Sequence, residues 1–293
     1  MRVRAPRTNP GAIVAEANPL LQGLLDDAAV FPPGNKPLEQ AVPDHREHRR
    51  SAHRDLVGPL VLPRTALDEI PRLTRGWADG GLEISLTGVP VTEAAAVAED
   101  AIGISSIRLA ALELVLGDPA PDRLAWRLTE LAAVLPGVQL FLEIPRGADG
   151  AYDTAVIEAL AGTPVMAKLR TGGVTPDLYP TDTQLADAIR AAVNSKVPFK
   201  ATAGLHHAIR NTAEVSAGER LEQHGFANLL TATGAALAGG DEQQVAKSLA
   251  ERDPKVVAQA LSQLDPGVRR AFRSFGTCSI DEPVEELDEL GLN

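Results

Sequence analysis

Two lysines of this chain lie inside apolar runs, where an unpaired ammonium group is costly to bury. Lys168 ends the run VMAK at 165–168, and Lys200 ends the run VPFK at 197–200. Two ammonium groups that converge make it easier for one of them to lose its proton, and a neutral amine attacks carbonyl carbon to form an imine. The sequence therefore predicts either imine chemistry at Lys168, tuned by Lys200, or a structural ion-pair network around both lysines.

Carboxylates and histidines near predicted strand ends could move the protons that such chemistry requires. Glu143 ends the apolar run 139–143, and His206 follows the run that carries Lys200. Asp27 lies in the apolar run 23–31, where successive strand residues face opposite sides. We expect these three side chains to be catalytic. The alternatives are that Glu143 is a salt-bridge partner of the lysines, that His206 packs or faces solvent, and that Asp27 caps a helix or loop.

The anionic end of a substrate needs cations and hydrogen-bond donors around it. Arg108 and Arg170 lie at predicted strand ends, where a guanidinium fork can bind phosphate or carboxylate. Alternatively, both arginines neutralise nearby carboxylates. Further substrate contacts are expected from Asp26, Thr202, Gly204, His207, Thr231 and Thr233.

Neither a cofactor nor a metal is expected. The adjacent residues His206 and His207 point apart on a strand, and no H-x-H or H-x-x-x-H pair accompanies them. Cys278 has no obvious base beside it in the sequence and is interpreted as a packed small residue. His45 lies among arginines on a predicted helix, which is typical of a solvated face.

The elements that position these residues alternate between short β-branched runs and stretches rich in Ala, Leu, Glu and Arg. The predicted strands are 23–31, 56–62, 82–86, 106–112, 139–144, 165–170, 198–202 and 226–231. The predicted helices are 38–51, 65–75, 92–99, 121–134, 152–160, 181–194 and 214–223. Runs that are apolar on both faces suit parallel strands, and eight strand–helix units are the number that closes a barrel.

We therefore predict a (β/α)8 barrel of the TIM type with extra C-terminal helices. One domain is expected over 1–293, with an N-terminal extension at 1–22 and helices plus an acidic tail at 241–293. The tail from Phe275 onward could close over one barrel end. If the segment 23–31 is a helix instead of a strand, seven strands remain, and an open doubly wound sheet becomes the alternative to the barrel. No G-x-G-x-x-G turn follows any predicted strand, which disfavours a dinucleotide site.

The composition of the chain limits the kinds of molecule that it is expected to bind. The 293 residues carry a net charge of −11 without a basic stripe, so nucleic acid is not an expected partner. No run approaches the roughly 18 apolar residues of a membrane span, no signal-peptide core is present and the only cysteine is Cys278. These features favour a cytoplasmic protein that acts on a small anionic carbonyl compound. Assembly into a homo-oligomer is left open.

Between 139 and 240 the chain resembles the deoxyribose-phosphate aldolases, which are the DeoC-like class I aldolases. The stretch KLRTGG at 168–173 resembles their K-x-x-T-G segment, and KATAG at 200–204 resembles K-A-S-G-G. Glu143 is similar to their acidic strand end, and TATG at 231–234 resembles their T-S-S-G turn. The resemblance implies a barrel in which Lys168 forms the imine and Lys200 tunes it. It also implies that the loops after strands seven and eight hold a phosphate.

One part of the family pattern is missing. The proton-relay aspartate on an early strand has no counterpart, since the segment 106–113 offers Arg108 and Glu113 instead. Over its whole length the chain also looks like a bacterial family of hypothetical proteins, through stretches such as 25–33, 199–207 and 275–283. That second resemblance implies no function.

Two other functions fit the same barrel. One is a hydrolase or isomerase that uses His206, Glu143 and one of the aspartates at 26 and 27, with or without a divalent metal. The other is a non-catalytic barrel that binds a small anion or a protein partner. Fold alone does not choose between these and the lyase.

Overall fold

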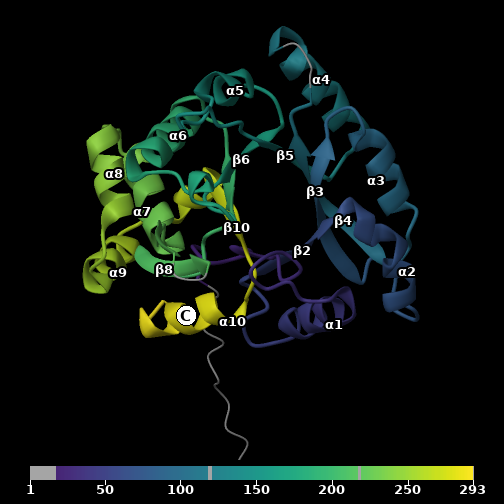
Figure 1. Ribbon diagram of the computed structural model, residues 1–293. Helices are drawn as coiled ribbons and strands as arrows, with labels where there is room; N and C mark the ends of the chain where they lie inside the picture. Colours follow the sequence, from purple (N-terminus) through teal and green to yellow (C-terminus); the bar gives the residue numbers. More distant parts are fainter. Residues whose placement is uncertain (1–17, 118–120, 217–218, 293) are drawn as a thin grey trace, which may run out of the picture.

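Eight parallel strands form a closed barrel in the computed structural model, which describes residues 18–117, 121–216 and 219–292 (Figure 1). The barrel strands are β1 (Leu25–Asp27), β2 (Val57–Pro63), β3 (Leu82–Pro90), β4 (Ile107–Val115), β5 (Gln139–Glu143), β6 (Met166–Arg170), β7 (Phe199–Thr202) and β10 (Phe272–Thr277). They follow one another around the barrel in chain order, and β10 pairs with both β7 and β1. The predicted (β/α)8 barrel is confirmed.

Helices lie around the outside of this barrel (Figure 1). They are α1 (Leu38–His48), α2 (Ile70–Leu73), α3 (Ala94–Ile102), α4 (Pro121–Val134), α5 (Thr154–Ala159), α6 (Asp182–Asn194), α7 (Phe226–Leu237), α8 (Glu242–Ala250), α9 (Pro254–Ser262) and α10 (Asp281–Glu289). Short 3-10 helices occur at η1 (Arg64–Asp68), η2 (Pro176–Leu178) and η3 (Pro266–Arg270). Among the described residues, no helix has the length and apolar character needed to span a membrane.

Local sequence signals explain several helix starts. Thr181 caps α6, where its hydroxyl accepts the backbone N–H of Gln184 while the Gln184 side chain accepts the N–H of Thr181. Asp241 and Gln244 form the same reciprocal pair at the start of α8. The starts of α6 and α8 are therefore well specified by the sequence.

The first strand is present but short. It covers Leu25–Asp27 and pairs with β2 and β10, so the open-sheet alternative is excluded. Alternation along this strand points the carboxylate of Asp26 into the barrel and that of Asp27 outward to α1.

The predicted eighth strand at 226–231 is wrong. Those residues form the first half of α7, and the eighth strand is β10, in a region that had been interpreted partly as a tail. The segment is buried on all sides of the helix, and an apolar run of that kind does not distinguish a strand from a buried helix. Phe226 of α7 stacks on Phe275 of β10 with ring centroids 4.7 Å apart, so the two elements pack together.

Two further expectations are corrected. The predicted helix at 214–223 belongs to an antiparallel pair, β8 (Asn211–Ser216) and β9 (Glu219–Gln223), inserted between β7 and α7. The acidic stretch that was expected to be a tail forms a helix, α10, which buries Val284 and Leu287. Of the predicted N-terminal extension, positions 1–17 lie outside the described residues.

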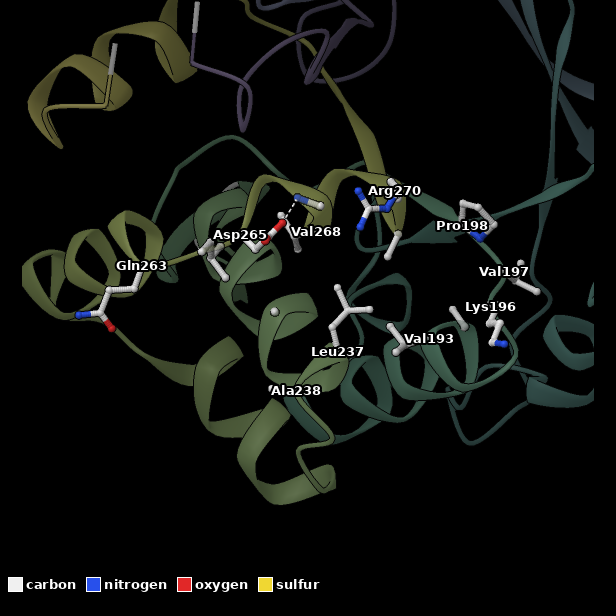
Figure 2. Close-up of a pocket in the computed structure, with 15 residues that line it drawn as sticks. Val193, Lys196, Val197, Pro198, Leu237, Ala238, Gln263, Asp265, Val268 and Arg270 are labelled. Atoms are coloured by element: carbon white, nitrogen blue, oxygen red, sulfur yellow. Dashed lines mark hydrogen bonds between the residues drawn. The ribbon is translucent and has the colours of Figure 1, made fainter.

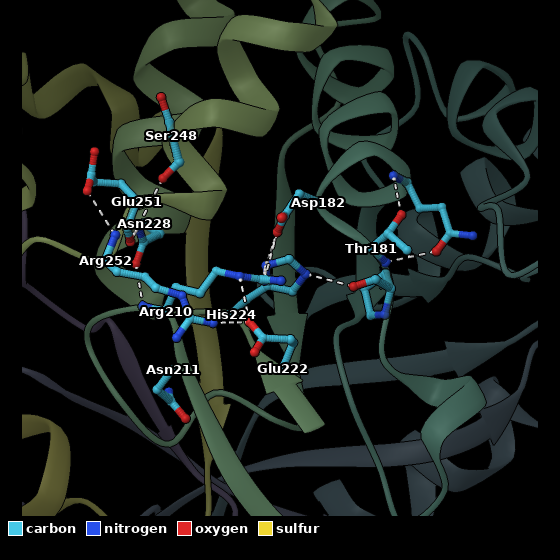
Figure 3. Close-up of polar contacts among 12 residues, drawn as sticks. Thr181, Asp182, Arg210, Asn211, Glu222, His224, Asn228, Ser248, Glu251 and Arg252 are labelled. Atoms are coloured by element: carbon cyan, nitrogen blue, oxygen red, sulfur yellow. Dashed lines mark hydrogen bonds and ion pairs between the residues drawn. The ribbon is translucent and has the colours of Figure 1, made fainter. Parts of the chain in front are cut away.

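A buried polar network ties this hairpin to the start of α6 (Figure 3). Arg210 contacts Asp182 at 2.7 Å and Glu222 at 3.4 Å, and its Nη1 donates to Nδ1 of His224 at 3.0 Å. The Nε2 of His224 then donates to the carbonyl of Pro180 at 2.9 Å. This pattern uses the neutral form of the imidazole, because Nδ1 must accept.

Stability should therefore fall with acid in a way that depends on His224. Burial, followed by the charge of Arg210, lowers the pKa of His224 from 6.5 to about 4. The unfolded chain binds this proton first, so stability is lost as the pH falls from 6.5 toward 4, by roughly 3 kcal/mol at most. Urea unfolding of wild type at pH 7, 5.5 and 4 should show this loss, and His224→Gln should show less of it.

The matched control is His53→Gln, at a half-exposed histidine in the loop after α1. It should follow the wild-type pH dependence. Equal acid losses in wild type and His224→Gln would contradict the assignment of a neutral imidazole.

Candidate active site at the carboxyl ends of the strands

The structure brings the two lysines together inside the barrel. Lys168 on β6 and Lys200 on β7 are directly paired in register, and both side chains point inward. Lys200 is 1% exposed and Lys168 is 4% exposed, so the former lies deeper and the latter closer to the opening. Lys168 is paired in register with Glu143, the last residue of β5, so the lysines lie on the side of the barrel where barrel enzymes hold their active sites.

Glu113 of β4 bridges the two ammonium groups. Its Oε1 accepts from Lys200 Nζ at 2.7 Å, and its Oε2 lies 2.8 Å from Lys168 Nζ. Ser85 of β3 donates to Oε1 at 3.0 Å. The side chain is 1% exposed, and both of its oxygens are engaged. Glu113 was not among the residues predicted for the site.

Asp26 completes the deep half of this cluster. Its Oδ2 accepts from Lys200 Nζ at 2.5 Å and from Ser274 Oγ at 2.7 Å. On β2, Gly58 leaves the space that the Asp26 carboxylate fills, because a Cβ at position 58 would collide with Oδ1. Asp26, expected to bind substrate, is thus a buried partner of Lys200.

Lys168 faces the rim of the barrel. Its Nζ lies 3.0 Å from Glu143 Oε2 and donates to Thr87 Oγ1 at 2.8 Å. The guanidinium of Arg170 lies 3.8 Å from the other Glu143 oxygen. The side chains of Glu143 and Arg170 are 24% and 38% exposed, so solvent reaches the cluster from this side.

The charges within the cluster are well defined. Burial alone would lower the pKa of Lys200, but Asp26 and Glu113 outweigh it and raise that pKa. Burial would raise the pKa of Glu113, but the two lysines hold it well below its usual value. Burial raises the pKa of Asp26, against the opposing effect of Lys200. Lys200 is accordingly an ammonium group and Glu113 a carboxylate.

A thiol and an imidazole meet beside the barrel opening. Cys278 follows β10 and His206 follows β7, and the Sγ lies 3.3 Å from Nδ1. Burial raises the pKa of the Cys278 thiol and lowers the pKa of His206. The pair is therefore a thiol beside a neutral imidazole, and the expectation that Cys278 has no base beside it is wrong.

The C-terminal helix contacts the same rim. Glu286 of α10 accepts from His207, with Nδ1 and Oε1 2.6 Å apart, and from the backbone N–H of Ala208. His207, expected to bind substrate, thus joins α10 to the loop after β7.

Two glycine-containing loops touch beside the lysines. A Cβ at Gly172 would lie 2.7 Å from the Cα of Gly204, so the loops after β6 and β7 can approach only without side chains. Thr171 donates to the carbonyl of Ala203 at 2.6 Å, which holds Ala203 at a left-handed φ of 64°. Gly204 is thus required by loop packing, and Thr202 lies just before it on the inward face of β7 above Lys200.

Four predicted site residues lie away from the lysines. Arg108 is at the amino end of β4, where it pairs with Glu83. Asp27 lies outside the barrel and contacts His45 of α1 at 3.0 Å. The remaining two are helical residues of α7 whose hydroxyls donate to backbone carbonyls of that helix, Thr231 and Thr233.

Whether a metal ion could bind depends on how closely the side chains that can ligate it are grouped. Within the described ranges, no group of three or more His, Cys, Asp or Glu side chains is gathered so that it could hold a metal ion. The carboxylates of the cluster contact ammonium groups instead, Asp26 and Glu113 at Lys200 and Glu143 at Lys168.

A cavity lies at the opposite end of the barrel from the lysine cluster. It measures about 600 Å³ and is lined by residues such as Val193, Pro198, Leu237 and Val268 (Figure 2). Pro198 precedes the first residue of β7, so this cavity opens at the amino end of the strand. The titratable cluster is at the other end of the barrel, and we place the candidate site there.

Comparisons with known proteins add no identification. The sequence matches no model of a known protein family, and no significantly similar curated protein was found.

Removing the central carboxylate should destabilise the fold. Glu113→Gln leaves two buried lysines without their shared counter-charge, which typically costs about 3–5 kcal/mol. Urea unfolding at pH 7 should show this loss, whereas Glu130→Gln at an exposed site on α4 should change stability by less than about 0.5 kcal/mol. Unfolding of Glu113→Gln at the wild-type midpoint would mean that the lysines do not depend on Glu113.

Proposed function

We propose that this protein is a lyase of the class I aldolase type, in which Lys168 forms an imine with a small carbonyl compound. The observation that carries this proposal is the position of Lys168, nearest the opening of a charged barrel interior and within 3.0 Å of the partly exposed carboxylate of Glu143. The resemblance of KLRTGG at 168–173 and KATAG at 200–204 to class I aldolase segments supports the same chemistry. The barrel is a fold that commonly carries enzymes, which supports catalysis but not a particular reaction.

The two lysines have different roles in this proposal. Lys200 is held as an ammonium group by two carboxylates and is deeply buried, so it serves as a fixed positive charge. Lys168 shares Glu113 with it and has a second carboxylate, Glu143, toward solvent. The amine that reacts is therefore Lys168, and Glu143 is the base that frees its electron pair.

The first half-reaction is balanced by these groups alone. The ammonium group of Lys168 gives one proton to Glu143, and the amine attacks the carbonyl carbon of the substrate. A proton moves from nitrogen to the former carbonyl oxygen, which gives a carbinolamine. Protonated Glu143 then returns its proton to this hydroxyl, which leaves as water, and a protonated imine remains on Lys168.

The second half-reaction uses the imine as an electron sink. The bond between the carbon α to the imine carbon and the next carbon breaks, and its electron pair moves toward nitrogen to give an enamine. The hydroxyl of the departing fragment loses its proton to Glu143 or to His206, and that fragment leaves as an aldehyde. Protonation of the enamine at the α carbon and hydrolysis of the resulting imine then release the second product and free Lys168. Bond formation is the reverse of these steps.

The substrate class follows from the rim. Arg170 places a partly exposed guanidinium beside Glu143, and Thr202 and the loop at 203–204 border the same opening. These groups suit a small carbonyl compound that carries a carboxylate or phosphate. Arg108, Thr231 and Thr233 are too far from the opening to take part, because they lie at the amino end of β4 and inside α7.

A second candidate is acid–base or thiol chemistry at the rim, as in a hydrolase or isomerase. The observation that favours it is the contact of 3.3 Å between Cys278 and a His206 ring that burial keeps neutral. In this case the lysine cluster is a structural charge network, and Lys168 does not react.

Borohydride trapping separates the two. Wild type is incubated with a panel of small aldehydes, ketones and 2-oxo acids, reduced, and analysed by intact mass and peptide mapping. We expect one adduct per chain, at Lys168. Lys168→Arg should lose it, because a guanidinium cannot form the imine, while Lys255→Arg on α9 should retain it. A folded wild type without adduct across the panel would refute the lyase proposal, and selective alkylation of Cys278 that blocks turnover would favour the second candidate.

The role of Glu143 has its own test. Glu143→Gln removes the proton acceptor beside Lys168 but keeps the size of the side chain, so the rate of adduct formation should fall about 100-fold. Stopped-time trapping with the best carbonyl compound measures this rate, and Glu158→Gln on α5 is the control. An unchanged rate in Glu143→Gln would assign the proton transfer to another group.

A further inference from the structure

A cavity lined by polar side chains lies outside the barrel, away from the lysines. It has a volume of about 380 Å³ and is bordered by the end of α1, the loop at 77–81 and the first residues of β3 and β4. Its charged lining consists of Arg46, Arg49, Arg50, Arg108 and Glu83. Four guanidinium groups around one carboxylate make this a positive cavity in a chain of net charge −11.

The arginines come from two separate parts of the chain. Arg46 lies in the last turn of α1, Arg49 is the residue that ends this helix, and Arg50 follows it. Cations at the end of a helix are favoured by its dipole, which accounts for some of this clustering. The dipole does not account for Arg108, which projects from the start of β4 and pairs with Glu83 in the same cavity.

A buried imidazole without a partner also lines the cavity. His45 is 2% exposed, and its Nδ1 is occupied by the Asp27 carboxylate at 3.0 Å. Its Nε2, on the opposite side of the ring, has no hydrogen-bond partner among the residues that the structure describes. Such a group costs about 1–3 kcal/mol when it stays unsatisfied, so a ligand atom at this point would be stabilising.

The shape of the cavity is fixed before any ligand arrives. The guanidinium of Arg46 lies 4.1 Å from the centre of the Trp77 ring, a stacking contact that holds its orientation. Glu83 is held by Arg108 and lies 3.5 Å from Arg49. Contacts within the protein thus orient Arg46, Arg49 and Arg108 before a ligand binds, which lowers the entropy cost of binding.

We propose that this cavity binds a phosphate group that carries a hydroxyl, as inorganic phosphate does at neutral pH. The arginine forks match the phosphate oxygens. A phosphate hydroxyl needs an acceptor, and the Glu83 carboxylate in the cavity lining supplies one, while His45, whose Nε2 has no partner among the described residues, also lines the cavity. Sulfate has the same shape but no hydroxyl at this pH, so the cavity discriminates against it. The same chemistry fits free phosphate and a small hydroxylated phosphate ester.

Calorimetric titration of wild type with inorganic phosphate and with sulfate, at pH 7 and constant ionic strength, tests this site. We expect one phosphate per chain, bound at least about tenfold more tightly than sulfate. Arg50→Gln and Arg108→Gln should each weaken phosphate about tenfold or more, as expected for loss of a charge-assisted hydrogen bond. Arg75→Gln, at an exposed arginine outside the cavity lining, should leave phosphate affinity unchanged.

Glu83→Gln tests the hydroxyl readout without disturbing the buried His45–Asp27 pair. Glutamine removes the negative charge, which weakens the acceptor for the phosphate hydroxyl and removes the repulsion toward sulfate, so the preference for phosphate should fall. Equal wild-type affinity for both anions would overturn the hydroxyl readout. No phosphate binding, or equal affinities in Arg50→Gln, Arg108→Gln and Arg75→Gln, would overturn the site.

The outcome is independent of the proposed lyase. Phosphate titration of Lys168→Ala should give the wild-type affinity, because Lys168 lies inside the barrel and the cavity lies outside it. Loss of phosphate binding in that variant would place the anion at the lysine cluster and overturn the assignment to this cavity. A titration of wild type with a sugar phosphate shows whether an ester binds as well as the free ion.

Discussion

A single carboxylate shared by two ammonium groups holds the centre of this barrel together. Glu113 takes the place of the aliphatic layer that fills most barrels of this type, and it makes the burial of Lys168 and Lys200 tolerable. None of the three is stable there alone, because an uncompensated buried charge costs several kcal/mol. Asp26 neutralises the charge of Lys200, and Glu143 neutralises that of Lys168. Solvent exposure rises across the cluster, from the buried Lys200–Asp26 pair to the partly exposed Glu143 at the rim. The same gradient separates the lysine that can only supply charge from the lysine that can react.

Much of the barrel could be predicted from the sequence, while its centre was largely missed for a local reason. Lysines at the ends of apolar runs correctly indicated strands β6 and β7. Thr87 was missed because the predicted strand at 82–86 stops just before it, and Glu113, although noticed at the end of the segment 106–113, was given no role because the predicted strand there stops at 112. The observed strands continue to Val115 and Pro90. Strand ends depend on which neighbour continues the hydrogen-bond ladder, and that information is not local.

The errors at the far end of the chain have a different physical origin. An apolar segment such as 226–231, buried on every side, has no periodicity that separates strand from helix. Assigning it as a strand displaced the true eighth strand and hid Ser274, which donates to Asp26. Asp27 was predicted to be catalytic because alternation places Asp26 and Asp27 on opposite faces without saying which is inside. His45 was predicted to lie on a solvated face because arginines surround it in the sequence. The partner that decides the face of Asp27 is on α1, eighteen positions away.

The closing strand has a consequence for how the chain reaches this structure. Asp26 is joined to Lys200 across 174 positions and to Ser274 across 248. Contacts this distant carry a large loop-closure entropy, so they form late, and chains rich in them fold slowly. Until β10 inserts between β7 and β1, both of those strands present open edges, and the lysines lack part of their counter-charge. A partly folded chain of this kind is prone to edge-to-edge association, which makes insertion of β10 the step that protects the protein from aggregation.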